Sequence, residues 1–171
     1  KKNVNVNKII FIGAGFLSQS ALFFQLKQKE IDKLVQVNIL NYIKCVHIIL
    51  PFMLKIKKGN FIYLSSFRSK VSSRGISLYA SSKAFGEMFF ETLGKEYGSL
   101  GIFSSSIRMG YFDGRMTNEL KEDKLKAVKL NAGNRKLGDE FDLINAIDFL
   151  LENNYANGGV LDLTGGINHE F

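Results

Sequence analysis

Tyr79 and Lys83 stand four residues apart in the segment LYASSKAF, and this pair could carry out proton transfer. On a helix, side chains at that spacing lie on one face. A phenol has a pKa of about 10, and a neighbouring ammonium favours its ionised form. A tyrosine whose pKa is lowered in this way can give or take a proton near neutral pH. The same spacing also occurs on exposed helices that have no chemical role.

A hydroxyl that could assist this pair comes from Ser66, which follows the apolar segment NFIYL and precedes Tyr79 by thirteen residues. A hydroxyl placed at a carbonyl oxygen donates a hydrogen bond to the charge that develops there. Taken alone, Ser65 and Ser66 would more simply cap the end of a strand. The presence of Tyr79 and Lys83 at this offset favours a catalytic interpretation.

The elements that must position these groups alternate between strands and helices. Apolar runs predict strands over 4–12, 60–64, 102–109 and 159–163. Helices are expected over 31–57, with a bend at Pro51, over 78–97, and over 139–153, with an acidic cap at Asp139. Residues 18–30 are compatible with a helix, and the irregular segment 110–138 could contain one over 116–130. This alternation predicts parallel pairing, an open α/β sheet and one domain over 1–171.

The segment KIIFIGAG poses a separate question, because an apolar strand followed by Gly13 and Gly15 can begin a dinucleotide-binding loop. That fingerprint requires a third glycine, where this chain has Ser18. It also requires a second strand that ends in an acidic residue. Glu30 and Asp32 lie at about the right distance, but no strand precedes them. The match is therefore partial and favours a later strand of such a fold.

Several features in one order resemble the short-chain dehydrogenase/reductase family. That family has an A-G at the end of its fourth strand, an asparagine on the next long helix, a serine at the end of the strand after it, and a Y-x-x-x-K pair on the active-site helix. It also has a glycine after the strand that follows the active-site helix, and a terminal glycine pair. The corresponding residues here are Ala14 and Gly15, Asn38 in LVQVNIL, Ser66, Tyr79 and Lys83, Gly110 in IRMGYFDG, and Gly165 and Gly166 in GVLDLTGG.

The resemblance implies a Rossmann-like, doubly wound parallel sheet that lacks its first strands. KIIFIGAG is then similar to the fourth strand of the family and not to the first. The sequence reads as the C-terminal two-thirds of such a domain, without the Gly-rich phosphate loop and without the residue that selects between cofactors.

By resemblance, the activity is that of an NAD(P)-dependent oxidoreductase. It would transfer a hydride between a nicotinamide cofactor and a small carbonyl or alcohol substrate. Tyr79 is the implied general acid or base, Ser66 binds the substrate oxygen, and Lys83 lowers the pKa of Tyr79 and holds the nicotinamide ribose. Asn38 is implied to interrupt its helix and fix a water that supplies protons to Lys83. Alone, Asn38 would more simply be a structural residue that bends the helix.

The cofactor cleft implied by the family is lined by one group of residues: Ala14, Gly15, Tyr79, Lys83, Met109, Gly110 and Phe112. The choice between NAD and NADP stays open. Ile12 and Gly13 replace two family asparagines, Met109 replaces a proline, and Gly114 stands where a threonine is usual. These departures motivate the alternative of a catalytically silent scaffold that has lost cofactor affinity.

Composition narrows the partners. The net charge of +7 is spread over scattered lysines, which favours a solvated basic surface over a nucleic-acid site, although an anionic ligand would also fit. Cys45 stands alone, which fits a reducing, cytoplasmic compartment, and His47 and His169 have no partner at metal-ligand spacing. No membrane span is expected. By analogy with the family, a homodimer or homotetramer would form through helices 34–57 and 78–97, and 111–138 could be a substrate lid or disordered.

Overall fold

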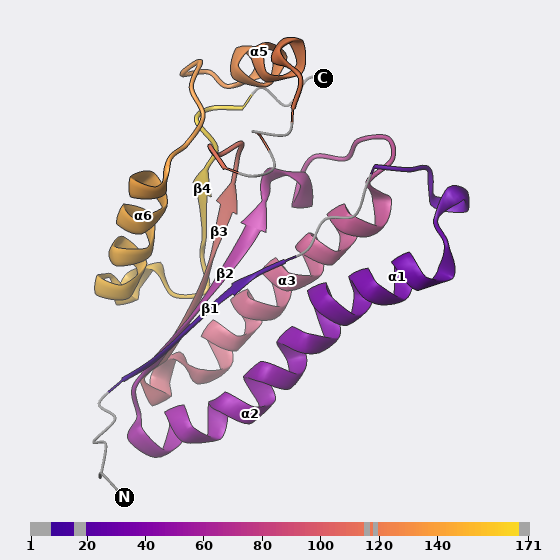
Figure 1. Cartoon of the computed structure of the whole chain (residues 1–171). Helices are drawn as coiled ribbons and strands as arrows, with labels where there is room; N and C mark the ends of the chain where they lie inside the picture. The colour runs from indigo at the N-terminus through magenta and orange to yellow at the C-terminus, as the bar shows by residue number, and fades with distance from the viewer. Residues whose placement is uncertain (1–7, 16–19, 115–116, 118–119, 168–171) are drawn as a thin grey trace, which may run out of the picture.

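The computed structural model describes residues 8–15, 20–114, 117 and 120–167. At its centre lies a sheet of four parallel strands, which follow one another across the sheet in chain order. These strands are β1 (Ile9–Ala14), β2 (Gly59–Ser66), β3 (Ile102–Met109) and β4 (Val160–Leu163). The parallel pairing confirms the predicted fold class. It also brings the carboxyl ends of all four strands to one edge of the sheet (Figure 1).

Helices cover both faces of this sheet, as a doubly wound fold requires. The segment formed by α1 (Gln28–Val35) and α2 (Asn41–Ile56) packs with α3 (Ser77–Tyr97) on one face, and α6 (Glu140–Glu152) covers the other (Figure 1). A further helix, α5 (Glu122–Asn131), lies beyond the carboxyl ends of the strands. Short 3-10 turns are η1 (Phe23–Gln25), η3 (Phe67–Ser69), η4 (Gly98–Leu100) and η5 (Asn154–Ala156).

The long helical segment is continuous from Gln28 to Ile56, but its hydrogen-bonding pattern changes in the middle. A π-helical turn, η2 (Gln36–Leu40), joins α1 to α2. The sequence predicts a bend at Pro51, whereas the change in helix type occurs around Asn38 and α2 continues through Pro51. Such π turns widen a helix locally and are frequent at functional sites.

Two predicted helices differ from those observed. The segment 20–27 is not α-helical, because Ala21 N–H and the Ser20 hydroxyl both bond to the carbonyl of Gly75, which ties the chain to a distant loop. The helix begins only at Gln28, where the Glu30 carboxylate accepts a hydrogen bond from the Lys27 N–H. The helix expected over 116–130 corresponds to α5, and Met116 and Ser18 lie outside the described residues.

The helix predicted from an acidic cap is confirmed at α6. The Asp139 carboxylate accepts from the Asp142 N–H at 3.0 Å, and the Asp142 carboxylate accepts in return from the Asp139 N–H at 3.0 Å. This reciprocal pair satisfies two backbone donors that the start of a helix otherwise leaves without partners.

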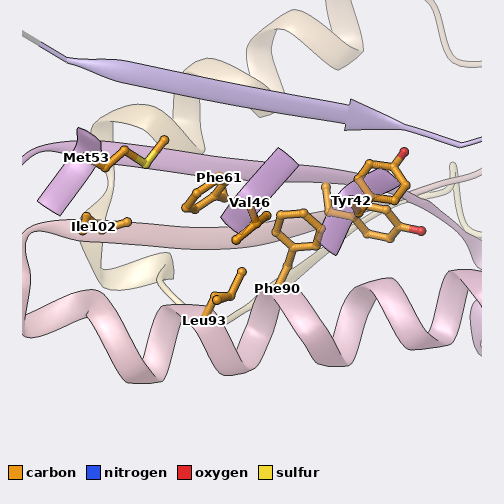
Figure 2. Packing of buried hydrophobic residues seen from close by; sticks show 8 residues of the cluster. Tyr42, Val46, Met53, Phe61, Phe90, Leu93 and Ile102 are labelled. Carbon is orange, nitrogen blue, oxygen red and sulfur yellow. The ribbon is translucent and has the colours of Figure 1, made fainter. Parts of the chain in front are cut away.

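The larger hydrophobic core lies between the sheet and the α2–α3 face, and it is rich in aromatic rings (Figure 2). The Phe90 ring stacks on Tyr63 with 5.1 Å between centroids, and Tyr42 meets Tyr63 edge-on at 5.2 Å. Gly86 makes room for this arrangement, because a Cβ atom there would lie 2.2 Å from the Tyr63 ring. A smaller aliphatic cluster of Ile62, Ile107, Ala146 and Leu150 joins the sheet to α6.

At the β1 side of the sheet, apolar side chains stay uncovered. Ile10 and Ile12 are 44% and 46% exposed, on the face opposite Phe11, which packs into the aromatic core. Strands of parallel sheets are normally buried on both faces. Within the described residues, β1 has a hydrogen-bonded neighbour on only one side.

Candidate active site

Asn38 lies in the π turn and is fully buried. Its side-chain amide donates to the Ser82 hydroxyl at 3.0 Å, and that hydroxyl donates to the Tyr79 carbonyl at 2.7 Å. The helix interruption expected at this residue is therefore observed. The two hydrogen bonds fix η2 against the first turns of α3, next to Tyr79.

Lys83 is buried on the same helix and points toward the sheet. Its Nζ donates to the Leu64 carbonyl at 2.7 Å and lies 5.1 Å from the centroid of the Tyr63 ring. Burial lowers the pKa of Lys83 to about 8, and the Glu87 carboxylate partly opposes that effect. A cation held by a carbonyl and an aromatic face is well positioned but incompletely solvated, so its proton is held less tightly than in water.

Tyr79 faces the same region, with 5.8 Å between its ring centroid and Lys83 Nζ. Burial raises the pKa of Tyr79, while a side-chain hydrogen bond with Ser66 and the charge of Arg68 act in the opposite direction. The sequence predicts a pKa lowered by Lys83. The structure gives a raised pKa of Tyr79 instead, because desolvation outweighs the hydrogen bond with Ser66 and the charge of Arg68.

Ser66 ends β2, where it caps a turn, as the structural interpretation expects, and lies beside Tyr79, as the catalytic interpretation requires. Its hydroxyl accepts a hydrogen bond from the Arg68 N–H at 3.3 Å, which caps the short turn η3. The hydrogen bond with Tyr79 places the same hydroxyl beside the phenol. The structure thus brings Ser66, Tyr79 and Lys83 together at the carboxyl ends of the strands, with Asn38 behind them.

Gly15 follows β1 directly and lies over two of these residues. A Cβ atom at this position would come within 2.8 Å of Lys83 Nζ and 3.0 Å of Asn38 Oδ1. Glycine therefore leaves open the space next to the buried ammonium. Both Ala14 and Gly15 are exposed, so this space borders solvent at the end of β1.

The other predicted cleft residues follow β3, whose last residue, Met109, pairs in register with Ser66. Met109 packs against the aliphatic cluster beneath α6. Gly110 donates to the Leu163 carbonyl at 2.9 Å, and a Cβ atom there would lie 2.8 Å from Thr164. Phe112 forms an isolated parallel bridge with Gly138. These residues therefore border the same edge of the sheet, where backbone close packing explains the glycine at 110.

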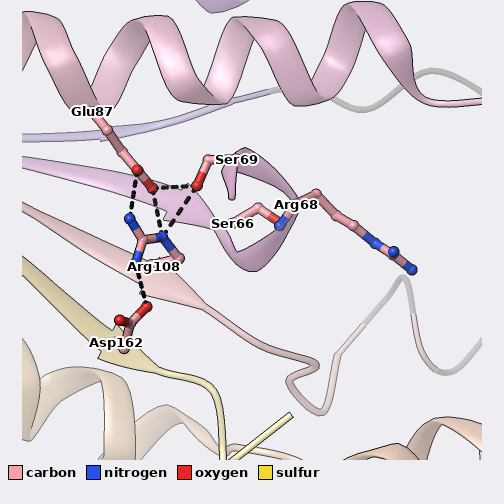
Figure 3. Close-up of polar contacts among 6 residues, drawn as sticks. All are labelled: Ser66, Arg68, Ser69, Glu87, Arg108 and Asp162. Atoms are coloured by element: carbon pink, nitrogen blue, oxygen red, sulfur yellow. Dashed lines mark hydrogen bonds and ion pairs between the residues drawn. The ribbon is translucent and has the colours of Figure 1, made fainter. Parts of the chain in front are cut away.

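An ionic network that the sequence did not predict lies behind Ser66 (Figure 3). Arg108 donates to both carboxylate oxygens of Glu87, at 3.1 and 2.8 Å, and to Asp162 at 2.6 Å. The Ser69 hydroxyl donates to Glu87 at 2.5 Å and accepts from Arg108 at 3.2 Å. The network joins η3 to α3, β3 and β4, and thereby fixes the turn that begins at Ser66. The arginine that follows IFSSSI in the predicted strand over 102–109 is the sequence signal for it.

A second arginine at this edge was also missed. The Arg68 guanidinium lies 4.4 Å from the centroid of the Phe67 ring, and its Nη2 donates to the Tyr111 hydroxyl at 3.2 Å. The Phe67 and Tyr111 rings are 5.2 Å apart, so the three side chains form one unit. Tyr111 comes from the loop after β3, so this unit links the chain that follows β2 to the chain that follows β3.

Within the described part of the chain, no group of three or more His, Cys, Asp or Glu side chains could hold a metal ion. His47 is exposed on α2, and His169 lies outside the described residues. Cys45 is a free, half-buried thiol. Among the described residues, no hydrogen bond or ion pair joins His47 or Cys45 to Ser66, Tyr79 or Lys83.

The parallel doubly wound sheet and the serine–tyrosine–lysine arrangement define a chain of the short-chain dehydrogenase class. The family model described as short chain dehydrogenase matches residues 2–125, and the chain belongs to this family. Among its relatives, a 3-oxoacyl-[acyl-carrier-protein] reductase of Staphylococcus epidermidis is 23% identical over 160 residues, or 92% of this chain and 66% of the relative. Carbonyl reductase family member 4 of Xenopus laevis is 27% identical over 97% of this chain and 69% of its own length.

Solved structures agree on the fold. A 2-deoxy-D-gluconate 3-dehydrogenase from Agrobacterium tumefaciens, with bound NADP, superposes with a TM-score of 0.85 at 20% identity and covers 92% of this chain and 66% of its own. ElxO with bound NADP gives a TM-score of 0.82 at 23% identity, with the same coverage. The chain thus spans about two-thirds of the length of most of these proteins.

Proposed function

We propose that the protein is an NAD(P)-dependent oxidoreductase that transfers a hydride between a nicotinamide cofactor and a carbonyl or alcohol carbon. The observation that carries this proposal is the meeting of Ser66, Tyr79 and Lys83 at the carboxyl ends of the strands. Ligands of open α/β sheets bind at this edge. Similar proteins are named as reductases or as dehydrogenases, which supports the same reaction type.

In the reduction direction, Tyr79 gives its proton to the substrate oxygen as negative charge develops there. Burial raises the pKa of Tyr79, which keeps the phenol protonated and ready to donate at neutral pH. Ser66 stabilises the same oxygen with a second hydrogen bond. Lys83 stabilises the phenolate that remains, and its pKa of about 8 lets it return a proton to Tyr79 afterwards.

The residues present fit the nicotinamide half of a cofactor. Gly15 leaves an open space beside the Lys83 ammonium and the Asn38 amide, where a ribose hydroxyl could bind. Ala14 lies next to this space, and Met109, Gly110 and Phe112 would border the nicotinamide from β3. When bound, the cofactor supplies or accepts the hydride. The two NADP-bound neighbours make NADP the first cofactor to test, with NAD beside it.

The proposal is tested with the full-length protein, NADPH or NADH, and a panel of ketones, by following cofactor absorbance. Tyr79→Phe keeps the ring but removes the transferable proton, so turnover should fall by about 10²-fold or more. Cofactor binding, measured by fluorescence titration, should stay within about 2-fold of wild type. Turnover that survives in Tyr79→Phe would overturn the assigned role.

The second candidate is a scaffold with the same fold and no cofactor affinity. It is favoured by one observation: Met109, at a position where the family has a proline, packs into the aliphatic cluster beneath α6. Titration of the full-length protein with NADPH and NADH by calorimetry separates the two candidates. Saturable binding of either nucleotide excludes the scaffold, whereas its absence, with the protein folded, excludes the oxidoreductase.

A second copy of the chain is the proposed partner for the outer surface of α2 and α3. Ile48, Phe52 and Met88 are each about 60% exposed on these helices. The helical segment from Gln28 to Ile56 is long and apolar enough to cross a membrane by length and composition. This segment packs on the sheet through Tyr42, Val46 and Met53, which favours a core helix of a cytoplasmic protein over a membrane span. The exposed apolar side chains on its outer surface favour a homodimer or homotetramer. Sedimentation of wild type and Phe52→Glu tests this surface.

A further inference from the structure

Arg68 carries a positive charge that is fixed in place at the edge of the candidate site. The residue is half-buried, and its backbone N–H bonds to Ser66. Its guanidinium rests on the Phe67 ring and bonds to the Tyr111 hydroxyl. Figure 3 shows the side chain extending away from the Glu87–Arg108 network, beyond the end of β2. An arginine held by a ring and a phenol is preorganised for a ligand.

No carboxylate neutralises this guanidinium among the residues that the structure describes. The chain from Ser65 to Gly86 contains Arg68, Lys70, Arg74 and Lys83 and no aspartate or glutamate. The nearby acidic residue Glu87 is fully engaged by Arg108 and Ser69. The positive charge of Arg68 therefore remains available to pair with an anionic group that is not among the described residues.

The guanidinium is also close enough to Tyr79 for its charge to act on the phenol, and it lowers the pKa that burial raises. The Ser66 hydroxyl bonds to the Tyr79 side chain and to the backbone N–H of Arg68, so the backbone that carries the guanidinium passes beside the phenol. A substrate whose oxygen is bound by Ser66 and Tyr79 would thus have its neighbouring atoms next to Arg68.

We propose that Arg68 binds an anionic group of the substrate, a carboxylate or a phosphate, close to the carbonyl or alcohol that reacts. This inference rests on the proposed oxidoreductase function and names its substrate class. The planar guanidinium presents paired donors that match two oxygens of such a group. Tyr111 occupies one donor and sets the plane, which leaves the remaining donors for the ligand.

The test compares substrates that differ only in this charge. Acetoacetate and its methyl ester share the reacting ketone, and dihydroxyacetone phosphate and dihydroxyacetone form the corresponding phosphate pair. For the full-length protein with its preferred cofactor, we expect kcat/KM to favour the anionic member of one pair. The pair that responds shows whether the anion is a carboxylate or a phosphate.

Arg68→Met should lower kcat/KM for the anionic substrate by about 10- to 100-fold, the size expected for losing hydrogen bonds to a charged group. The neutral partner should change by less than about 3-fold. Arg68→Lys keeps the charge and loses the fork, so it should recover only part of the loss. Lys70→Met is the matched control, because it removes an equal charge from an exposed position two residues away and should leave the ratio unchanged.

Equal losses for both members of a pair in Arg68→Met, or the same change of ratio in Lys70→Met, would overturn the inference and leave the oxidoreductase proposal intact. Binding of acetoacetate and inorganic phosphate to the cofactor-free protein, followed by NMR, separates the two further. Saturable binding that Arg68→Met abolishes supports the anion site even if no ketone is reduced. Neutral ketones reduced faster than anionic ones would also refute it.

Discussion

Arg108 and Arg68 lie at the same edge of the sheet, yet their surroundings differ in one respect. Arg108 is bound by the carboxylates of Glu87 and Asp162, and its side chain is 11% exposed. Arg68 contacts a ring and a phenol and no described carboxylate. A charge that is paired with carboxylates of the same chain, as at Arg108, joins structural elements. A charge that is fixed in position without a carboxylate partner, as at Arg68, can bind and select a ligand. Stability experiments should therefore respond to Arg108, and substrate selectivity to Arg68.

Arg108→Met should have the largest effect on stability. It leaves the Glu87 carboxylate buried without its strongest partner, so the free energy of unfolding should fall by about 3 kcal/mol or more. Urea denaturation measures this change. The double variant Arg108→Met with Glu87→Leu removes both charges and should recover much of the loss. A double variant as unstable as the sum of both single changes would contradict the pairing.

Lys83 extends the comparison to a cation balanced mainly by a carbonyl. Its pKa is about 8 in the folded protein and about 10.4 in an unfolded chain. Between these values the unfolded chain binds more protons, so the free energy of unfolding should rise with pH by on the order of 1–3 kcal/mol. Denaturation of wild type and Lys83→Met at about pH 7.5 and about pH 9.5 isolates this contribution.

The sign for Lys83 is opposite to that of the buried tyrosines. Burial raises the pKa of Tyr63 and Tyr79, so these groups stabilise the fold below pH 10 and lose that contribution above it. Glu87 opposes the effect of burial on the pKa of Lys83 and therefore narrows the pH range over which Lys83 changes the free energy of unfolding. A pH slope that is the same in wild type and Lys83→Met would show that Lys83 keeps an ordinary pKa.

Arg68→Met should cost little stability, by contrast with Arg108→Met. The lost contacts are one cation–π interaction and one hydrogen bond at a half-buried position, together worth about 1 kcal/mol. The midpoint in urea should shift slightly, while the selectivity between acetoacetate and its ester changes greatly. A loss of stability as large as that of Arg108→Met would show that Arg68 is structural.

The exposed pair of Glu91 and Lys95 on α3 should have the smallest effect. Its atoms are 2.7 Å apart, but Lys95 is 69% exposed, so water and salt screen the attraction. Glu91→Gln should lower the free energy of unfolding by about 0.3–0.5 kcal/mol. The same urea series measures it and gives the lower limit of the comparison. A loss of stability near that of Arg108→Met would show that burial does not explain why the Arg108 ion pairs stabilise the fold more than the exposed pair.

Local patterns in the sequence predicted the elements and the central site residues. Apolar runs located the strands, and the spacing of Tyr79 and Lys83 placed them on one helix face. The family order then added Asn38 and Ser66, which the structure brings to the same region. The strands and most helices are confirmed because each depends on neighbours along the chain, whereas the roles of the site residues stay predictions that rest on a motif of fixed spacing.

The missed features depend on contacts that spacing does not encode. The pairing of Arg108 with Asp162 follows from the register of β3 and β4, and the contact of Arg68 with Tyr111 joins two separate loops. The late start of α1 has the same cause, because Ala21 is bound to Gly75 across the fold. Tyr79 was given the wrong direction of pKa shift because burial cannot be read from its neighbours in sequence.

The fit of the Tyr63 ring against Gly86 has a consequence for comparing sequences of this kind. A larger side chain at 86 would collide with the ring, so the two positions are expected to change together, bulky with glycine or small with large. The ring also lies under the Lys83 ammonium. Covariation between positions 63 and 86 would therefore identify, from sequences alone, the proteins in which the lysine at position 83 lies over an aromatic ring.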